Sequence, residues 1–239
     1  MILGRRRFYP GPAASGIVTP ALVGTPTWTR SVSGSTGNVT VAMPTGTTEG
    51  QTLLLYQTRV ASGAGLGTEY AGATTLIATE GNPIGGSGSK KSNTRISTIA
   101  ATSGMISSGI VLNVGPYALA GVLAFDVPTI FVPIHATPNN STNWVVGAAD
   151  GQTTRAFLTQ TGAEGDLALQ FAVCYDVATA SGTITPWSWI QTDTTGGTAQ
   201  TQVAIASEVL AAAGSTDAAT TTWSAASQLQ SIPILARAA

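Results

Sequence analysis

The sequence predicts an all-β protein, and three observations support that prediction. Short apolar segments recur along the chain, of which 39–43 alternates with period two, and turn signals follow every ~8–15 residues. Gly, Pro, Asn, Ser and Thr separate these segments and form turns, because glycine accepts positive φ and proline cannot donate a ladder hydrogen bond. Only residues 202–213 are dense enough in Ala and Leu to fit a helix, and β-branched residues leave strand and helix both open there. This pattern predicts a sandwich, jelly roll or barrel.

The chain divides into an arm and a body. Residues 1–27 are rich in Pro, Gly and Ala and show no period, which predicts an extended N-terminal arm that orders against a neighbouring subunit. Residues 28–239 carry the strand-like segments and form one β domain, a size that one sandwich can occupy. We expect strands over 39–43, 52–60, 74–79, 95–101, 109–114, 118–126, 144–148, 167–177, 187–192, 202–210, 220–225 and 231–236.

One sequence feature occurs twice. The turn 45–50, TGTTEG, leads into the apolar residues 53–55, and the turn 161–165, TGAEG, leads into 167–169. In each copy a corner containing glycine and a carboxylate introduces a strand that crosses the middle of the core. This favours a jelly-roll-like sandwich of two sheets with similar halves. Chance similarity in so biased a composition is the alternative.

The composition points to a subunit of an assembly. Charged residues are 9% of the chain, against about 25% in a typical soluble domain. The net charge of −1 favours association and argues against nucleic acid as a partner, because phosphate binding needs clustered Lys and Arg. No apolar stretch reaches the ~18 residues of a membrane span, so we expect no membrane insertion.

We predict no catalytic residue, no cofactor and no metal site. His135 is the only histidine and no nucleophile elbow lies near it, so a loop or interface histidine is expected. Glu164 and Asp166 are the only acids close in sequence; they suit a turn, with a weak Ca²⁺ loop as the alternative. Cys174 is the single cysteine and is expected to be a small buried hydrophobe.

The arm carries the candidate docking residues. Arg5, Arg6 and Arg7 can pair with carboxylates on a neighbouring protein, and Phe8 and Tyr9 follow them directly. A merely solvated basic tail is the alternative.

Two tryptophans are candidate glycan contacts. Trp187 and Trp189 alternate in an extended segment and would share one face, where solvent-facing rings can stack on sugars. A buried or interface aromatic pair is the favoured alternative.

Several short motifs together resemble a known group of proteins. They are MILGRR at 1–6, WTR at 28–30, VTVAMPTG at 39–46, EGQTLLL at 49–55, TWSAA at 222–226 and IPILAR at 232–237. This order resembles bacteriophage virion proteins, the minor tail and particle-surface proteins of phages of high-GC bacteria. The resemblance covers about residues 28–239 and rests on turn-plus-strand motifs. The chain departs from it with Gln51 where Asp is usual, although Asp166 follows Gly165 in the second copy.

The resemblance implies a jelly-roll-like structural subunit of the virion that forms a homo-oligomer, a trimer or higher, and binds other virion proteins. A minor tail or tail-tip protein is the first expectation, and a capsid decoration or head-spike protein is the second. From another functional class, the rival is a module that binds a glycan receptor on the host surface through Trp187 and Trp189. A polysaccharide-degrading enzyme is a third, weaker rival, and the group has no catalytic residues to transfer.

Overall fold

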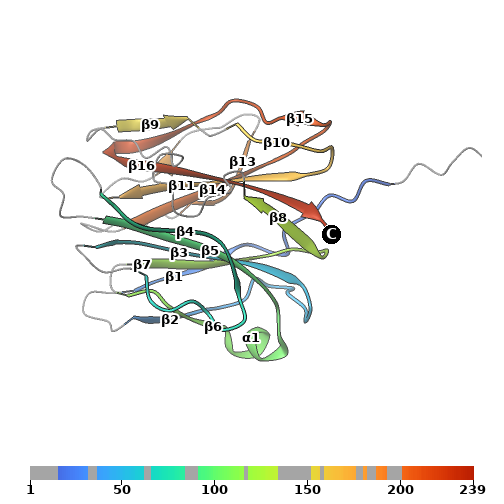
Figure 1. Ribbon diagram of the computed structural model, residues 1–239, viewed down its shortest axis with the longest axis horizontal. Helices are drawn as coiled ribbons and strands as arrows, with labels where there is room; N and C mark the ends of the chain where they lie inside the picture. The colour runs from blue at the N-terminus through green and yellow to red at the C-terminus, as the bar shows by residue number, and fades with distance from the viewer. Residues whose placement is uncertain are drawn as a thin grey trace, which may run out of the picture.

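The all-β sandwich is confirmed. The computed structural model describes residues 16–31, 37–61, 66–83, 91–115, 118–133, 152–156, 159–175, 180–181, 187–192 and 201–239. Over these residues the chain forms sixteen strands and one short helix, and every strand pair is antiparallel. Two large sheets pack face to face (Figure 1).

The first sheet comes from the N-terminal half of the chain. Its order is β1-β7-β3-β5-β4, with β3 in the middle. The strands are β1 (Thr27–Arg30), β3 (Thr52–Ala61), β4 (Thr74–Pro83), β5 (Lys91–Ala100) and β7 (Ala118–Ala124). A two-stranded pair, β2 (Asn38–Val41) with β6 (Ile110–Asn113), and the helix α1 (Ser103–Ser108) cover its outer face.

The second sheet comes from the C-terminal half. Its order is β12-β16-β11-β14-β13, and β8 and β9 also pair with the long strand β16. The strands are β8 (Thr129–Pro133), β9 (Gln152–Ala156), β11 (Leu167–Tyr175), β12 (Ala180–Ser181), β13 (Ser188–Thr192), β14 (Thr201–Val209) and β16 (Thr220–Ala238). A second small pair joins β10 (Thr161–Gly162) to β15 (Gly214–Ser215).

The two halves share one topology. The first sheet has the order β1-β7-β3-β5-β4, and the second has the matching order β8-β16-β11-β14-β13. The small pair β2–β6 corresponds in the same way to the small pair β10–β15. Because each half of the chain forms its own sheet, the predicted jelly-roll order is not confirmed. A jelly roll distributes successive strands over both sheets, whereas this chain completes the first sheet before it begins the second.

The first turn of the sequence echo folds tightly in front of β3. Gln51 N–H donates to the Thr48 carbonyl (3.3 Å), and Thr48 N–H donates to Gln51 Oε1 (2.8 Å). Gly50 has φ +86° and donates to the Ala101 carbonyl (2.9 Å), which ties the turn to the end of β5. Glycine is required here because this φ strains any residue with a Cβ.

The second turn repeats this arrangement in front of β11. Asp166 N–H donates to the Ala163 carbonyl (3.2 Å), and Ala163 N–H donates to Asp166 Oδ2 (2.8 Å). Gly165 has φ +83° and donates to the Leu210 carbonyl at the end of β14 (2.8 Å). Asp166 therefore takes the place of Gln51, and the sequence echo corresponds to a repeated three-dimensional corner.

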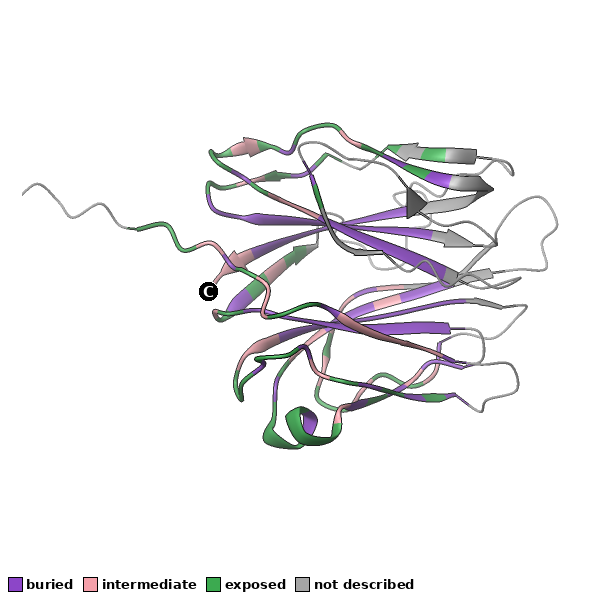
Figure 2. Cartoon of the chain, turned by 180° about the vertical axis from the view of Figure 1, so that it is seen from behind, coloured by how far each residue is buried: buried purple, intermediate pink, exposed green. Residues whose placement is uncertain are grey.

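Equivalent residues of the halves meet in the central core. Tyr56 lies on β3 and Phe171 at the matching place on β11, and their ring centroids are 5.6 Å apart. The largest buried side chains between the sheets are Leu54, Tyr56, Ile96, Leu119, Leu123, Phe125, Leu169, Phe171, Ile205, Ile232 and Ile234. Both halves contribute to one core, so the protein folds as one body (Figure 2).

The outer faces of both sheets are also covered. All seven residues of β7 are buried, because the β2–β6 pair packs on the face that points away from the central core. On the second sheet, Trp187 and Trp223 pack over small residues of β11 and β14. Burial on both faces explains continuous apolar strands such as ALAGVLA, where one-sided burial would give alternation.

Most expected strands are present with shifted ends. The open choice for 202–213 resolves as strand β14 over Thr201–Val209, which pairs along its length with β11. The two strands expected at 220–225 and 231–236 form the single strand β16. The strand expected at 144–148 lies outside the described residues. The sequence pattern did not predict β1, β8, β9, the three two-residue strands β10, β12 and β15, or helix α1.

Candidate functional site

The end of the expected arm is bonded to the body. Val23 N–H donates to the Ala124 carbonyl (2.8 Å), and Asp126 N–H donates to the Ala21 carbonyl (3.0 Å). The Asp126 carboxylate accepts in return from Ala21 N–H (2.8 Å). These bonds extend the edge of the first sheet beyond β1, so the body begins before residue 28.

Further upstream, the arm lies on the second sheet. A Cβ placed on Gly165 would be 2.2 Å from Ile17 Cγ2, so Ile17 sits directly on the second corner. Even so, 54% of Ile17 and 56% of Val18 are exposed. The arm therefore crosses from one sheet to the other and then leaves the body close to the C-terminal residue (Figure 2). The equivalent Gly50 has nothing within 4 Å of such a Cβ.

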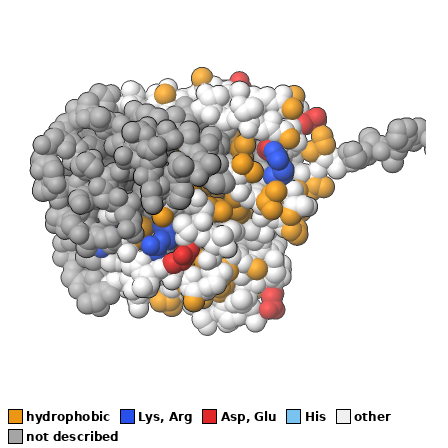
Figure 3. All heavy atoms as spheres, in the orientation of Figure 1, with side chains coloured by type: hydrophobic (Ala, Val, Ile, Leu, Met, Phe, Trp, Pro, Cys, Tyr) orange, Lys and Arg blue, Asp and Glu red, His pale blue; other side chains and the backbone are white. Residues whose placement is uncertain are grey.

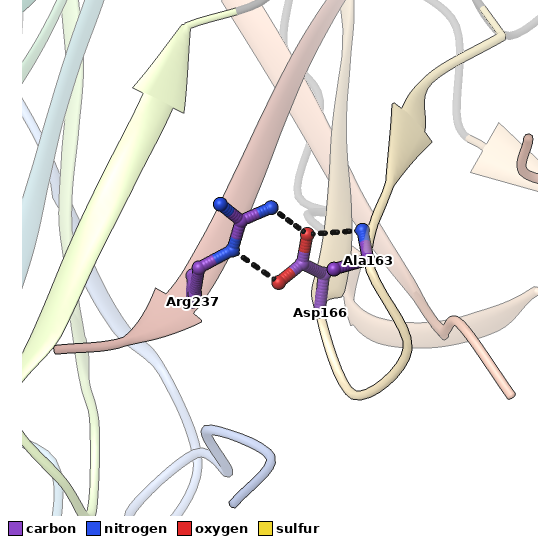
Figure 4. Close-up of polar contacts among 3 residues, drawn as sticks. All are labelled: Ala163, Asp166 and Arg237. Carbon is purple, nitrogen blue, oxygen red and sulfur yellow. Dashed lines mark hydrogen bonds and ion pairs between the residues drawn. The ribbon is translucent and has the colours of Figure 1, made fainter. Parts of the chain in front are cut away.

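A bidentate ion pair joins this second corner to the end of β16 (Figure 4). Arg237, near the end of β16, donates through Nε to Asp166 Oδ1 (2.7 Å) and through Nη2 to Asp166 Oδ2 (2.6 Å). The Asp166 side chain is 2% exposed and that of Arg237 is 42% exposed. The guanidinium hydrogen bonds lower the pKa of Asp166, and burial opposes them only partly. The carboxylate in turn raises the pKa of Arg237.

Beside this pair lies the edge strand β8. Ile130 pairs with Arg237 and Val132 with Leu235, so Ile130 and Val132 share the outer face. They are 49% and 38% exposed. Phe131 points the other way and packs edge-on against Phe125, with centroids 5.2 Å apart. Among the described strands, β8 has a partner only on its β16 side.

These parts form one continuous surface, which we call the assembly surface: Ile17, Val18, Ile130, Val132 and the Asp166–Arg237 pair. Four of the seven large hydrophobic side chains found exposed in the described chain belong to it. Figure 3 shows hydrophobic side chains beside a basic side chain at the end of the body where the arm leaves. The surface is mainly apolar, with the Asp166–Arg237 pair and the exposed Glu164 of the same turn as its charged groups. Exposed apolar patches of this kind often mark sites of contact with other proteins, membranes or ligands.

A second feature is an open depression of about 550 Å³ at the corner after β14. Its lining is Ser188, Ser207, Glu208, Val209, Leu210, Ala211, Ala212, Ala213, Gly214, Ser215 and Asp217. Burial raises the pKa of Glu208, and the negative charge of Asp217 raises it further. The hydrogen bond that Asp217 N–H donates to Glu208 Oε2 (3.2 Å) acts in the opposite direction. In the described parts of the chain, no three His, Cys, Asp or Glu side chains are grouped to hold a metal ion.

Trp187 is positioned as a core residue. It is 4% exposed, and its Nε1 donates to the Asp217 carbonyl (3.0 Å). This position fits the buried-aromatic alternative, and we do not retain Trp187 as a glycan contact. Trp189 belongs to β13, and its side chain lies outside the described residues.

The other residues singled out in the sequence divide into two groups. Arg5, Arg6, Arg7, Phe8, Tyr9 and His135 lie outside the described residues. Asp166 belongs to a turn, as its favoured interpretation required, and Glu164 is exposed in the same turn. Sequence reasoning missed the Asp166–Arg237 pair, because its members lie 71 positions apart. It also missed β8, although the β-branched and aromatic run TIFVP was a usable signal.

Comparisons with known proteins identified no relative of this chain. No family model, curated protein or solved structure matches the chain. In the described residues no helix has the length and apolar character needed to cross a bilayer.

Proposed function

We propose that this chain is a structural subunit of a bacteriophage virion, a minor tail or tail-tip protein that enters the particle through its N-terminal arm and its β body. The observation that carries the proposal is the arm's route. The arm is bonded to the first sheet, lies on the corner of the second, and leaves the body next to an exposed apolar surface. We therefore expect residues 1–15, which precede this segment in the sequence, to contact a neighbouring subunit.

Composition and sequence resemblance support the same proposal. A chain with 9% charged residues and a net charge of −1 has little electrostatic protection against association. Thr, Ser, Ala and Gly replace Lys, Glu and Arg in its composition, and surfaces of that kind are easier to bury against a partner. The motifs that resemble minor tail and particle-surface proteins fall on real elements: the first corner with β3, and the end of β16.

Two other roles remain as alternatives. A capsid decoration or head-spike protein would use the same arm and assembly surface at another site on the particle. A receptor module that binds host glycans has less support, because Trp187, one of its two candidate contacts, is buried.

Incorporation into particles tests the proposal. The full chain and a variant lacking residues 1–15 are expressed during infection by the phage that encodes it, and purified particles are analysed by mass spectrometry and immunogold labelling. We expect full-length protein at the tail and loss of the truncated form, with both proteins melting at the same temperature. Particles without the protein would refute a virion role. Labelling of the head would instead select the decoration alternative.

The three arginines give a sharper variant of this test. Arg5→Ala, Arg6→Ala and Arg7→Ala together remove the basic cluster while keeping the length of the arm. If this cluster pairs with partner carboxylates, incorporation falls and becomes more sensitive to salt. Unchanged incorporation would mean that the cluster is a solvated tail.

A further inference from the structure

We infer that the open depression after β14 is a dock for the chain's own arginine cluster, Arg5, Arg6 and Arg7, so that the far end of the arm binds back onto the body. Three observations support the inference: the charge of the depression, the place where the arm meets the body, and the equivalent corner of the first half. In a virion, this contact holds the arm on its own body until carboxylates of a neighbouring subunit compete for the cluster. The inference itself does not depend on the virion role.

The depression gathers negative charge in a chain that carries few charges. Glu208 and Asp217 both line it, and its described lining includes no Lys or Arg. Asp217 N–H lies 3.4 and 3.2 Å from the two oxygens of the Glu208 carboxylate. Burial, and then the charge of Asp217, raise the pKa of Glu208, so a cation beside this carboxylate would be favourable. A guanidinium suits the site, because it can donate two parallel hydrogen bonds to one carboxylate.

The remaining lining suits the residues that follow the arginines. Val209 is 51% exposed, and the alanines at 211–213 are exposed beside it. Phe8 and Tyr9 come directly after the cluster, which holds three of the 10 Lys and Arg residues of the chain. A segment that is basic and then aromatic therefore matches a depression that has two carboxylates and an apolar wall.

The arm meets the body beside this depression. Ile17 lies over Gly165, and Gly165 N–H donates to the carbonyl of Leu210, which lines the depression (2.8 Å). Figure 1 places β15 at the same end of the molecule as the arm. Arg7 stands ten positions before Ile17, and a flexible segment of that length spans about 16–19 Å. Such a tether gives a millimolar effective concentration, which favours the chain's own arm over that of a second copy.

The internal repeat shows that the equivalent corner of the first half is filled. Helix α1 lies between β5 and β6, and residues 210–213 lie at the matching place between β14 and β15. Met105 of α1 is 5% exposed and packs into the core on the outer side of the first sheet. The second half has a short alanine run instead of a helix, and the depression lies at this corner. The docked arm would take the place that α1 has in the first half.

Disulfide trapping in the full chain tests the inference. In a Cys174→Ala background, Gly4→Cys puts one thiol beside the arginines, and Ser215→Cys puts another at an exposed position of the depression. Ser108→Cys replaces Ser215→Cys in the control, because Ser108 is exposed at the end of α1, the equivalent corner. At about 1 µM protein under mild oxidation, we expect the intrachain disulfide to form at least about tenfold faster with Ser215→Cys.

Charge variants separate docking from reach alone. Glu208→Gln keeps an acceptor for Asp217 N–H and should slow trapping at Ser215→Cys by about two- to fivefold, the effect of one partly exposed ion pair. Loss of a negative charge would by itself favour the thiolate and speed the reaction, so a slower rate reports docking. The triple arginine-to-alanine variant and high salt should also slow trapping. Glu49→Gln, which changes the exposed acid of the first corner, is the matched control and should leave the rate unchanged.

Three results would overturn the inference. Equal trapping rates at Ser215→Cys and Ser108→Cys would mean that the arm does not prefer the depression. A rate at Ser215→Cys that is insensitive to Glu208→Gln would mean that proximity, not the carboxylate, explains trapping. A disulfide that joins two chains and increases with protein concentration would assign the depression to the arm of a neighbouring copy. The presence or absence of the protein in particles changes none of these results, so the two proposals can fail separately.

Discussion

Arg237→Ala should destabilise the fold more than Asp166→Ala, and the two effects should not add. Removing Arg237 leaves a carboxylate that is 2% exposed with one remaining donor, Ala163 N–H. Removing Asp166 instead releases a guanidinium that is already 42% exposed, so water can solvate it. The asymmetry in burial therefore decides which single variant costs more.

The size of each effect follows from the hydrogen bonds and the exposure. Breaking a buried ion pair by removing one partner costs about 3–5 kcal/mol. Because Arg237 reaches the surface, water enters when it is removed, and screening lowers this to about 2–3 kcal/mol. Asp166→Ala loses the charge-assisted bonds and the turn bond to Ala163, at about 1–2 kcal/mol net. The double variant has no unpaired charge, so it should cost about 1–2 kcal/mol less than the sum of the two single variants.

A double-mutant cycle in urea measures this coupling. Free energies of unfolding for wild type, both single variants and the double variant come from the midpoints, with slopes checked for constancy. A cost of 1 kcal/mol corresponds to about 2–4 °C in melting temperature for a chain of this size. Additivity within about 0.5 kcal/mol would refute the reasoning, because groups that act independently add to that accuracy.

Three further predictions concern pH and packing. The pKa of Asp166 is lowered in the folded state, so Asp166 contributes fully to the free energy of unfolding above its unfolded pKa of about 3.9. This contribution is lost as the pH falls through the folded-state pKa, and acid unfolding of Asp166→Asn should lack that loss. Gly121→Ala should lower the free energy of unfolding by about 1–3 kcal/mol, because a Cβ there would lie 2.2 Å from the Tyr56 ring. In a Tyr56→Leu background the same substitution should cost less, and equal costs in the two backgrounds would count against a clash with Tyr56. Trp187→Ala should cost about 3–5 kcal/mol in urea unfolding, whereas a stable variant that loses glycan binding would restore Trp187 as a surface contact.

Much of the fold could be predicted from the sequence, because strands and turns have local signals. Period-two alternation located β2, apolar segments located β3 and β5, and the glycine-containing corners located the starts of β3 and β11. The repeated corner was visible because Gly50 and Gly165 meet the same conformational demand, a positive φ that few other residues accept.

Most of the candidate site could not be predicted from the sequence. Its ion pair joins a turn to a strand 71 positions later, and no local pattern specifies that contact. The exposure of Ile130 and Val132 depends on which strand lies beside β8, and apolar residues in a strand are more often buried.

The sequence by itself determined that the chain is all-β, where most of its strands run, and that it has few charges with which to repel partners. Tertiary structure decided the order of the strands, the choice of strand over helix in β14, the burial of Trp187, and the union of arm, ion pair and β8 edge in one surface. The physical reason is range. Backbone conformation follows from neighbouring residues, whereas pairing, burial and surface depend on segments brought together only when the two halves close on a shared core.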